Sequence, residues 1–530
     1  MTFVSATFIA FLLILFLLYY ILPKPMQWPL LLIAGYVFYA FAGPKFLIYV
    51  AVTTVTAWLG TTSIYKLQLE QKDFLAANKS TLDRDGRKKY KAAMKKRQQL
   101  LFWCTLLINI GMLAIVKYTD FVIFNINSVM SIFRTGSKLE FLDIALPLGM
   151  SFYTFQIVGY IIDVYRGKHP PEKNLFKLGL FVSFFPQMIQ GPISRFSDLA
   201  PDLYGQHKFS SNKFSMGLQR IIWGYFKKVV IADRVIAAVS VIFQDPDQYK
   251  GVYVFIGMLF YALQLYADFT GGIDITIGIA QSLGIGLKEN FERPFFAKST
   301  AEYWRRWHIT MGTWFRDYIF YPLSVSKPML KLSNKSRKIL GSGFGRRLPV
   351  YVSTIIVWFT TGLWHGASWN FVVWGLLNGF VIIASQELEP AYAVFHKRFS
   401  VAGKTWFRIF QIARTFFLMA SIRLLDCYRD VGLTFRQYIS MFTEFNPAVI
   451  SNGSLMKLGL SIADYILLII GTIMLISVSM IQRRGGVRAK LAAKPLVLRY
   501  ILFSLLFISI ILFGAYGIGY DSNQFIYNQF

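Results

Sequence analysis

Thr361-Gly-Leu-Trp-His-Gly-Ala-Ser-Trp-Asn370 lies within a run, residues 348–386, that contains no Asp, Glu, Lys or Arg. One membrane crossing needs about 20 apolar residues, so this run is long enough for two. His365 brings an ionisable imidazole into it, and such a group at membrane depth usually faces a cavity or a transport path. Gly362 and Gly366 predict breaks in the helix on either side. We expect a site here, with a histidine that merely packs in the core as the alternative.

The composition indicates an integral membrane protein. Of the 530 residues, 55% are hydrophobic and 16% are charged, and the net charge is +29. The Lys and Arg residues gather in short segments between apolar stretches, at 66–97, 327–347 and 483–488, which is the positive-inside pattern and not a nucleic-acid surface. These segments predict cytoplasmic loops, with the N-terminus on the outer side.

The apolar stretches predict an all-α polytopic protein with about ten to twelve transmembrane helices, the remainder being re-entrant or interfacial. We treat residues 1–530 as a single membrane domain, with the core motifs in 144–385 and C-terminal helices in 404–530. The stretches are 4–22, 28–42, 46–65, 100–118, 144–164, 178–193, 216–243, 252–283, 350–361, 371–385, 407–425, 462–480 and 500–519.

A second histidine lies in an aromatic segment. Ser299 followed by Glu302 predicts a capping box and the start of a helix. The large side chains that follow would share one face of that helix: Trp304, Trp307, Met311 and Trp314. This pattern is typical of a helix at the membrane interface, and His308 flanks its apolar face. Function and packing are equal alternatives for His308.

Two carboxylates, Asp268 and Asp274, occur inside an apolar segment and therefore need partners. Arg305 or Arg306 is a candidate partner for one of them. A role in holding helices together is as plausible for this pair of carboxylates as a role in catalysis.

The sequence contains no His-Glu-x-x-His, no Cys-x-x-Cys, no phosphate-binding glycine loop and no Gly-x-Ser-x-Gly. No metal site and no bound cofactor are therefore expected. A buried imidazole remains, which would stay neutral and serve as a general base on a hydroxyl or a thiol.

These motifs together resemble the membrane-bound O-acyltransferase (MBOAT) family. The resemblance is to its bacterial branch, which includes alginate and peptidoglycan O-acetyltransferases and the related teichoic-acid D-alanyltransferase. The segments that carry it are Phe184-Phe-Pro-Gln-Met-Ile-Gln-Gly-Pro-Ile-Ser-Arg195, Tyr266-Ala-Asp-Phe-Thr-Gly-Gly-Ile-Asp274, Tyr303-Trp-Arg-Arg-Trp-His308, Arg316-Asp-Tyr-Ile-Phe-Tyr-Pro322, Gly362-Leu-Trp-His-Gly-Ala-Ser-Trp-Asn370 and Phe525-Ile-Tyr-Asn-Gln-Phe530.

The resemblance implies transfer of an acyl group, which we expect to be acetyl, from a cytosolic thioester to an extracytoplasmic polysaccharide of the cell wall or an exopolysaccharide. The donor would be acyl-coenzyme A or an acyl-carrier phosphopantetheine. It also implies a bacterial cytoplasmic-membrane location, helices around a central funnel, and a singly anchored extracytoplasmic SGNH-type partner protein. His365 and His308 match the family's catalytic histidines. We expect these residues in the substrate site: Trp364, Trp304, Arg305, Asp268 and Asn370.

Two other functions are alternatives to acyl transfer. A proton-coupled transporter or flippase would use the same intramembrane His and Asp residues, but it would favour inverted repeats, and none stands out. A non-catalytic scaffold of a polysaccharide secretion machine would tolerate loss of either histidine.

Overall fold

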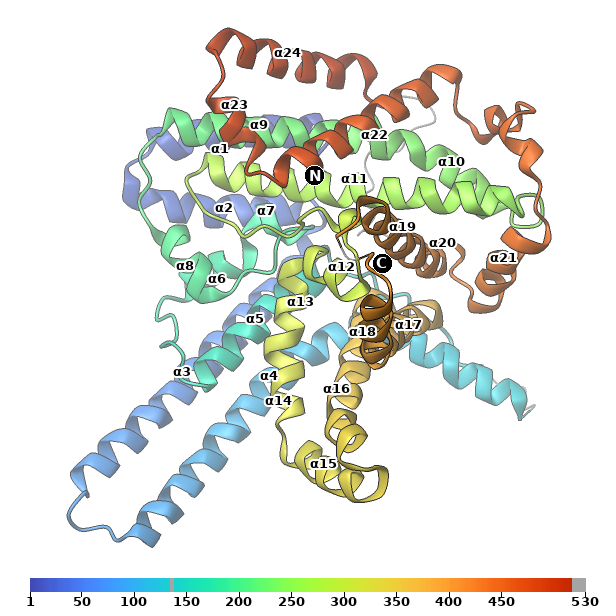
Figure 1. The fold of residues 1–530 in the computed structure, drawn as a ribbon. Helices are drawn as coiled ribbons and strands as arrows, with labels where there is room; N and C mark the ends of the chain where they lie inside the picture. The colour runs from blue at the N-terminus through green and yellow to red at the C-terminus, as the bar shows by residue number, and fades with distance from the viewer. Residues whose placement is uncertain (134–137, 402, 517–530) are drawn as a thin grey trace. The chain divides into compact units, whose positions relative to one another are not determined.

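The computed structural model describes residues 1–133, 138–401 and 403–516, and its regular elements within these ranges are helices (Figure 1). The described chain forms two compact units. The first is made mainly of Ser5–Phe214 with Ala280–Leu287, and the second mainly of Ser215–Ile279 with Lys288–Phe530. The all-α class is confirmed, while the single domain and the central funnel stay predictions. The family motif at 525–530 lies outside the described residues.

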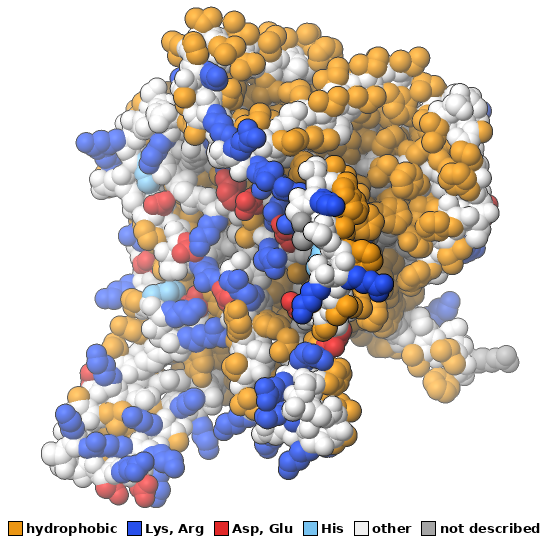
Figure 2. All heavy atoms as spheres, viewed as in Figure 1, with side chains coloured by type: hydrophobic (Ala, Val, Ile, Leu, Met, Phe, Trp, Pro, Cys, Tyr) orange, Lys and Arg blue, Asp and Glu red, His pale blue; other side chains and the backbone are white. Residues whose placement is uncertain are grey.

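The first unit holds the N-terminal helices. α3 and α4 form a long antiparallel hairpin, and Asp83 caps the start of α4 by accepting a hydrogen bond from the Gly86 backbone. Figure 2 shows Lys and Arg side chains gathered around the turn of this hairpin, where the first basic segment lies. The elements are α1 (Ala6–Ile21), α2 (Gln27–Ala40), α3 (Leu47–Ala77), α4 (Arg84–Ile132), α5 (Met150–Tyr165), α6 (Leu175–Ser183), α7 (Phe185–Met188) and α8 (Phe196–Tyr204).

The second unit contains the predicted site. It begins in α9 (Ser211–Tyr225), which continues through a π-helical segment, η3 (Phe226–Ala232), into α10 (Asp233–Gln244). The other helices are α11 (Val252–Ser282), α12 (Thr300–Arg306), α13 (Ile309–Phe315), the π-helix η5 (Arg316–Phe320), α14 (Tyr321–Ser324), α15 (Lys327–Leu340), α16 (Ser342–His365), α17 (Trp369–Glu387), α18 (Glu389–Arg398), α19 (Thr405–Ile422), α20 (Leu424–Tyr428), α21 (Val431–Thr443), α22 (Ile462–Gln482), α23 (Val487–Ala492) and α24 (Leu496–Phe513).

Six of the described helices are long and apolar enough to cross a membrane: Pro44–Ala77, Arg84–Ile132, Val252–Ser282, Trp369–Glu387, Ile462–Gln482 and Leu496–Phe513. In α22 and α24 only 22% and 6% of the apolar window is buried within the protein. Figure 2 shows hydrophobic side chains covering these helices. Apolar surface on this scale is stable only against lipid, so both helices face the bilayer. The predicted ten to twelve crossings remain a prediction.

Backbone contact between α9 and α11 organises the second unit. A Cβ atom on Gly224 would lie 2.6 Å from the Gly271 carbonyl oxygen, and one on Gly271 would lie 2.9 Å from the Gly224 oxygen. A Cβ atom on Gly278 would likewise lie 2.8 Å from the Gly217 carbonyl oxygen. Small residues at such crossings let membrane helices pack at van der Waals distance. The glycines of the Gly271-Gly-Ile-Asp motif thus serve close helix packing.

The close approach brings buried opposite charges together. Lys228 in η3 lies 2.7 Å from both Asp233 and Asp268, and the exposed fraction of each side chain is 5% or less. Asp274 accepts hydrogen bonds from Arg220 at 2.7 Å and Lys227 at 2.5 Å. The π-helical turn lets two consecutive lysines both reach α11 carboxylates.

The predicted pairing of Asp268 or Asp274 with Arg305 or Arg306 is therefore wrong. The α9–η3 segment supplies the cations instead, because it packs directly against α11. Arg306 pairs with Glu302 within its own helix, at 2.6 Å.

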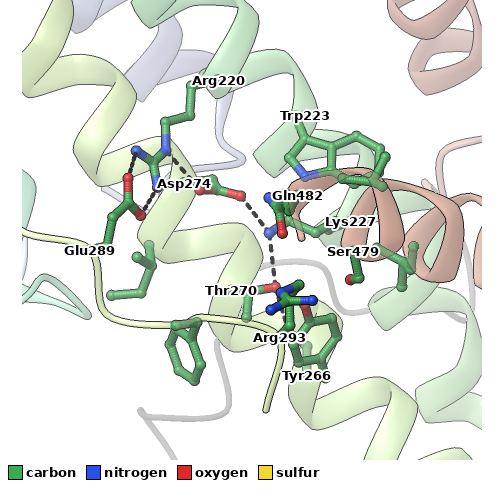
Figure 3. A pocket seen from close by; sticks show the side chains of 14 residues that line it. Arg220, Trp223, Lys227, Tyr266, Thr270, Asp274, Glu289, Arg293, Ser479 and Gln482 are labelled. Carbon is green, nitrogen blue, oxygen red and sulfur yellow. Dashed lines mark hydrogen bonds and ion pairs between the residues drawn. The ribbon is translucent and has the colours of Figure 1, made fainter. Parts of the chain in front are cut away.

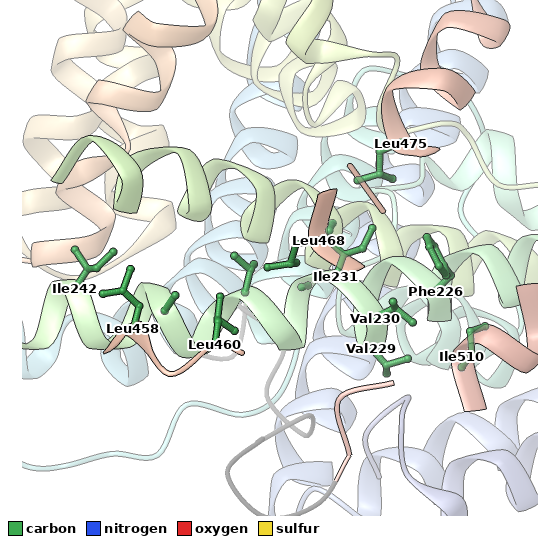
Figure 4. Close-up of a cluster of buried hydrophobic side chains, with 14 of the residues drawn as sticks. Phe226, Val229, Val230, Ile231, Ile242, Leu458, Leu460, Leu468, Leu475 and Ile510 are labelled. Carbon is green, nitrogen blue, oxygen red and sulfur yellow. The ribbon is translucent and has the colours of Figure 1, made fainter. Parts of the chain in front are cut away.

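An apolar cluster surrounds η3 and joins it to the C-terminal helices (Figure 4). Side chains of η3 and α10 pack there against Leu468 and Leu475 of α22 and Ile510 of α24. The Ala515 backbone donates a hydrogen bond to the Val229 carbonyl at 2.8 Å, which the widened π-turn leaves accessible. The C-terminal helices are thereby attached to the segment that carries the buried lysines.

The contact at Gly224 predicts a strong effect of added volume. Gly224→Val should lower the thermal unfolding temperature of the detergent-purified protein and its monodisperse yield, because the new side chain collides with backbone atoms. Overpacking of this kind typically costs about 1–3 kcal/mol. Gly111→Val is the matched control, because no neighbouring atom lies within 4 Å of a Cβ there. Equal stability of the two variants would contradict close α9–α11 packing.

Candidate active site

His308 lies at a break between two short helices. α12 ends at Arg306, Trp307 pairs with Phe291 in an isolated antiparallel bridge, and α13 begins at Ile309. The Ile309 backbone donates to the Asn290 carbonyl at 2.9 Å. His308 itself has φ 48° and ψ 51°, the left-handed region that non-glycine residues adopt at a cost of about 1–3 kcal/mol. Strain held by surrounding hydrogen bonds is common at functional sites.

The prediction of one continuous helix through this segment is wrong, and the extended pairing with residues 290–292 is the reason. The capping prediction is confirmed in part. Ser299 accepts a hydrogen bond from the Glu302 backbone at 3.2 Å, but the Glu302 carboxylate accepts from the Lys298 backbone and not from that of Ser299.

Asn290 determines which nitrogen of His308 carries the proton. The Asn290 Oδ1 accepts hydrogen bonds from the backbone N–H of Thr310 at 3.0 Å and from its hydroxyl at 2.9 Å. A backbone N–H can only donate, so the atom facing it is the amide oxygen. His308 Nδ1, 3.3 Å from the same oxygen, must then donate to it. This assigns the neutral Nδ1–H tautomer, with Nε2 as the proton-accepting nitrogen.

Burial, and to a smaller extent the positive charge of Arg423, lowers the pKa of His308 to about 3. The ring is 1% exposed and packs at 5.1 Å against Phe269. His308 therefore stays neutral at physiological pH.

An aromatic chain connects the two predicted histidines. The rings of His308 and Trp364 are 5.9 Å apart, those of Trp364 and His365 are 5.1 Å apart, and His365 lies 4.6 Å from Trp374. Each pair meets edge to face, the favoured geometry of aromatic contacts. The structure thus brings the two histidines together across a single tryptophan ring.

His365 is the last residue of α16, and Gly366 caps the helix. A Cβ at Gly366 would collide with the Phe371 ring, so only glycine allows this turn into α17. The predicted break at Gly362 is wrong, because α16 continues through it. Gly362 instead approaches the Phe371 carbonyl, where a Cβ would lie at 2.4 Å. It closes the contact between α16 and α17.

A buried ion pair that the sequence reasoning missed completes the site. Arg423 donates a hydrogen bond to Asp426 at 2.9 Å, and their side chains are 7% and 1% exposed. The Arg423 guanidinium lies 4.7 Å from the centre of the Trp374 ring, 5.4 Å from that of Trp307 and 5.8 Å from that of Trp304. Charge and cation–π contacts together fix the tryptophans around both histidines. An Arg and an Asp three positions apart at the end of an apolar stretch were the available signal.

A cavity of about 520 Å³ opens beside His308, with a mostly apolar lining. Trp304, Arg305 and His308 line it, together with Arg316 and Thr361. Trp304 also donates to the Asn378 side chain at 3.2 Å, which fixes its orientation. A second cavity of about 380 Å³ has a mixed lining, whose polar side chains include Tyr261, Gln264, Asp426 and Arg429. Arg423 contacts Trp307 in the lining of the first cavity and Asp426 in the lining of the second, so it connects the walls of the two cavities.

The other predicted site residues lie away from these linings. Asp268 is held in the ion pair with Lys228. Asn370 donates to the Leu425 carbonyl at 3.0 Å and so ties α17 to α20. Trp364 and His365 lie behind the cavity wall, in contact with His308 and Trp374. Among the described residues, no group of His, Cys, Asp and Glu side chains is arranged to hold a metal ion.

The low pKa of His308 predicts acid sensitivity. An unfolded histidine titrates near 6.5, so below that pH the unfolded state binds a proton that the folded state excludes. Stability should fall as the pH drops from 6.5, by about 2 kcal/mol at pH 5 from this group. Thermal unfolding of His308→Gln should show a smaller loss between pH 7 and 5 than wild type. Exposed His396→Gln should behave as wild type, and equal losses in both variants would contradict the lowered pKa.

The Arg423–Asp426 pair predicts a non-additive mutant cycle. Arg423→Leu leaves a buried carboxylate uncompensated and should cost about 3–5 kcal/mol of stability, whereas the double variant with Asp426→Leu should lose less than either single change. Arg347→Leu is the control, since its salt bridge to Glu387 is exposed and worth at most about 1 kcal/mol. If the losses of unfolding temperature in the two single variants sum to the loss in the double variant, the pair is not coupled.

Comparison with known proteins places this site in a family. The sequence profile of the MBOAT, membrane-bound O-acyltransferase family matches residues 168–422. The "Probable alginate O-acetylase AlgI" of Azotobacter vinelandii is 32% identical over 447 residues, which cover 84% of this chain and 78% of the relative. The peptidoglycan O-acetyltransferase of Helicobacter pylori is 32% identical over 55% of this chain and 56% of its own. The teichoic acid D-alanyltransferase of Bacillus subtilis is 24% identical over 51% and 65%. The chain belongs to the membrane-bound O-acyltransferase family and is a multi-pass membrane O-acyltransferase.

Proposed function

We propose that this protein transfers an acetyl group from a cytosolic thioester, acyl-coenzyme A or an acyl-carrier phosphopantetheine, toward an extracytoplasmic polysaccharide. The observation that carries the proposal is the neutral, tautomer-fixed His308 in the wall of a 520 Å³ cavity, one tryptophan away from His365. The names of the relatives support an acetylated polysaccharide, since they include an alginate O-acetylase and a peptidoglycan O-acetyltransferase.

In this proposal the apolar cavity takes the thioester arm, and the second cavity, with polar side chains in its lining, admits the acceptor hydroxyl. Arg305 and Arg316 at the first cavity suit the charged part of the donor. The basic segments of α15 and of residues 483–488 are assigned to the cytoplasm, and the N-terminus to the outer side. The inner membrane of a bacterium is the proposed location.

The reaction is an attack of the acceptor oxygen on the thioester carbonyl. A histidine takes the hydroxyl proton as the C–O bond forms, the C–S bond then breaks, and the departing thiolate accepts a proton. We assign the base to His365 and the positioning of the donor to His308. Trp364 separates the two rings, so a rotation of its side chain is required to join His365 to the cavity.

A singly anchored extracytoplasmic SGNH-type protein is the proposed partner, which would pass the acetyl group to the glycan. A hydroxyl of that partner and a sugar hydroxyl are chemically equivalent acceptors for the second cavity. The buried aspartates Asp268 and Asp274 are neutralised by fixed internal cations, an arrangement that favours a structural role over the proton relay of a transporter.

His365→Ala is predicted to lower acetyl transfer by about 10²–10⁴-fold, the usual contribution of a general base. The assay follows labelled acetyl-coenzyme A onto the partner or glycan with purified, folded protein. His308→Ala should chiefly raise the KM for the donor. Exposed His396→Ala is the control and should leave transfer unchanged. If the His365→Ala protein keeps most of its activity, this histidine is not the base. If the wild-type protein transfers no label from acetyl-coenzyme A, the proposal is wrong.

A further inference from the structure

A separate polar pocket lies at the end of α22 (Figure 3). It shares no lining residue with the two cavities of the candidate active site. Its volume is about 60 Å³, which suits a single small polar group. Side chains of α9, η3 and α11 form one wall, the segment 289–293 forms another, and Ser479 and Gln482 of α22 complete it. Figure 3 shows Arg293 and Gln482 beside Lys227 in this pocket.

The carboxylates of the pocket are already engaged by two of its cations. Arg220 binds Glu289 through both terminal nitrogens, at 2.6 and 2.5 Å, and binds Asp274 through Nε. Lys227 donates to Asp274 at 2.5 Å and to the Thr270 hydroxyl at 2.8 Å. An ammonium group has three N–H donors, so one remains for a ligand. Arg293 is a further cation in the lining, so the positive charges outnumber the negative ones.

Additional arginines increase this positive charge. Burial lowers the pKa of Arg293, and the charges of Arg306, Arg483 and Arg408 lower it further against the opposing effect of Glu292. Like charges held this close repel one another, and a bound anion would relieve the repulsion. The backbone of Arg293 is also in the left-handed region, at φ 49°, a conformation that carries an energetic cost.

The third wall of the pocket belongs to a helix that faces lipid. α22 is apolar, largely unburied and followed directly by Arg483-Arg484. Basic pockets between transmembrane helices on the cytoplasmic side are suited to the phosphates of anionic lipids. Trp223 also lines the pocket, and tryptophan favours the headgroup level of a membrane.

We propose that this pocket binds the phosphate group of a phosphate ester, with Arg293, Lys227 and Gln482 as hydrogen-bond donors. Two sources share this chemistry: an anionic phospholipid whose chains lie along α22, and the phosphate-bearing part of the thioester donor. The second source rests on the proposed acyl transfer, and the first does not.

The test measures ligand-induced shifts of the thermal unfolding temperature of the full chain in detergent. Phosphatidylglycerol is compared with phosphatidylcholine, and coenzyme A with pantetheine, which lacks the phosphates. Arg293→Gln should raise the concentration needed for half of the shift by about 10-fold or more for phosphatidylglycerol or for coenzyme A, as expected for one charge-assisted hydrogen bond. Arg337→Gln, an exposed arginine of the basic α15, removes the same charge elsewhere and should leave the response intact.

A weakened response to phosphatidylglycerol identifies the lipid as the source, and a weakened response to coenzyme A identifies the donor. Unchanged responses to both ligands overturn the proposal. Gln482→Glu, at the exposed end of α22, gives a second reading if Arg293→Gln does not fold, because the added negative charge should repel the phosphate. Binding is read without turnover, so failure of the acyl-transfer proposal and failure of this one are separate results.

Discussion

The backbone pairing of residues 290–292 with residues 306–309 is the constraint on which the candidate site depends. It ends α12 at Arg306, forces His308 into a left-handed conformation and delivers the Asn290 side chain to the imidazole. A continuous helix would have satisfied the same backbone groups at lower conformational cost. The strained backbone at His308 instead fixes the position of the imidazole, and the Asn290 contact fixes its protonation state, both in the absence of substrate.

Charge compensation is the second constraint. Burying an ionised group is tolerable only when an opposite charge and hydrogen bonds accompany it. The second unit solves this with separate local pairs: Lys228 between two aspartates, Arg220 and Lys227 on Asp274, and Arg423 on Asp426. Each pair also joins two elements or fixes an aromatic cluster. The same charges therefore determine how α9, α11 and α20 are placed.

The sequence predicted the fold class, because apolar length is a local feature, and it singled out two histidines that the structure brings together across Trp364. It failed where tertiary pairing overrides local pattern. The period of Trp304, Trp307 and Met311 fits one helix, yet the strand-like partner of Trp307 comes from residues 290–292. The partners of Asp268 and Asp274 come from α9 and η3, and no spacing rule connects residues that lie 40 to 54 positions apart. Arg423 is different, because its partner Asp426 lies only three positions away and the local signal was missed.

The arrangement of the two histidines bears on how water is kept from the reaction. In the proposed reaction a thioester at His308 would lie in an apolar cavity, and the acceptor would enter the second cavity, whose lining includes Asp426. Between them stand Trp307 and the Arg423 guanidinium, with Trp364 between the imidazoles. Aromatic rings held by a cation exclude water well, and in the proposed reaction a rotation of the Trp364 side chain would give His365 access to the cavity. Under the proposed reaction, such a wall would open for an acceptor and protect the thioester from hydrolysis at other times.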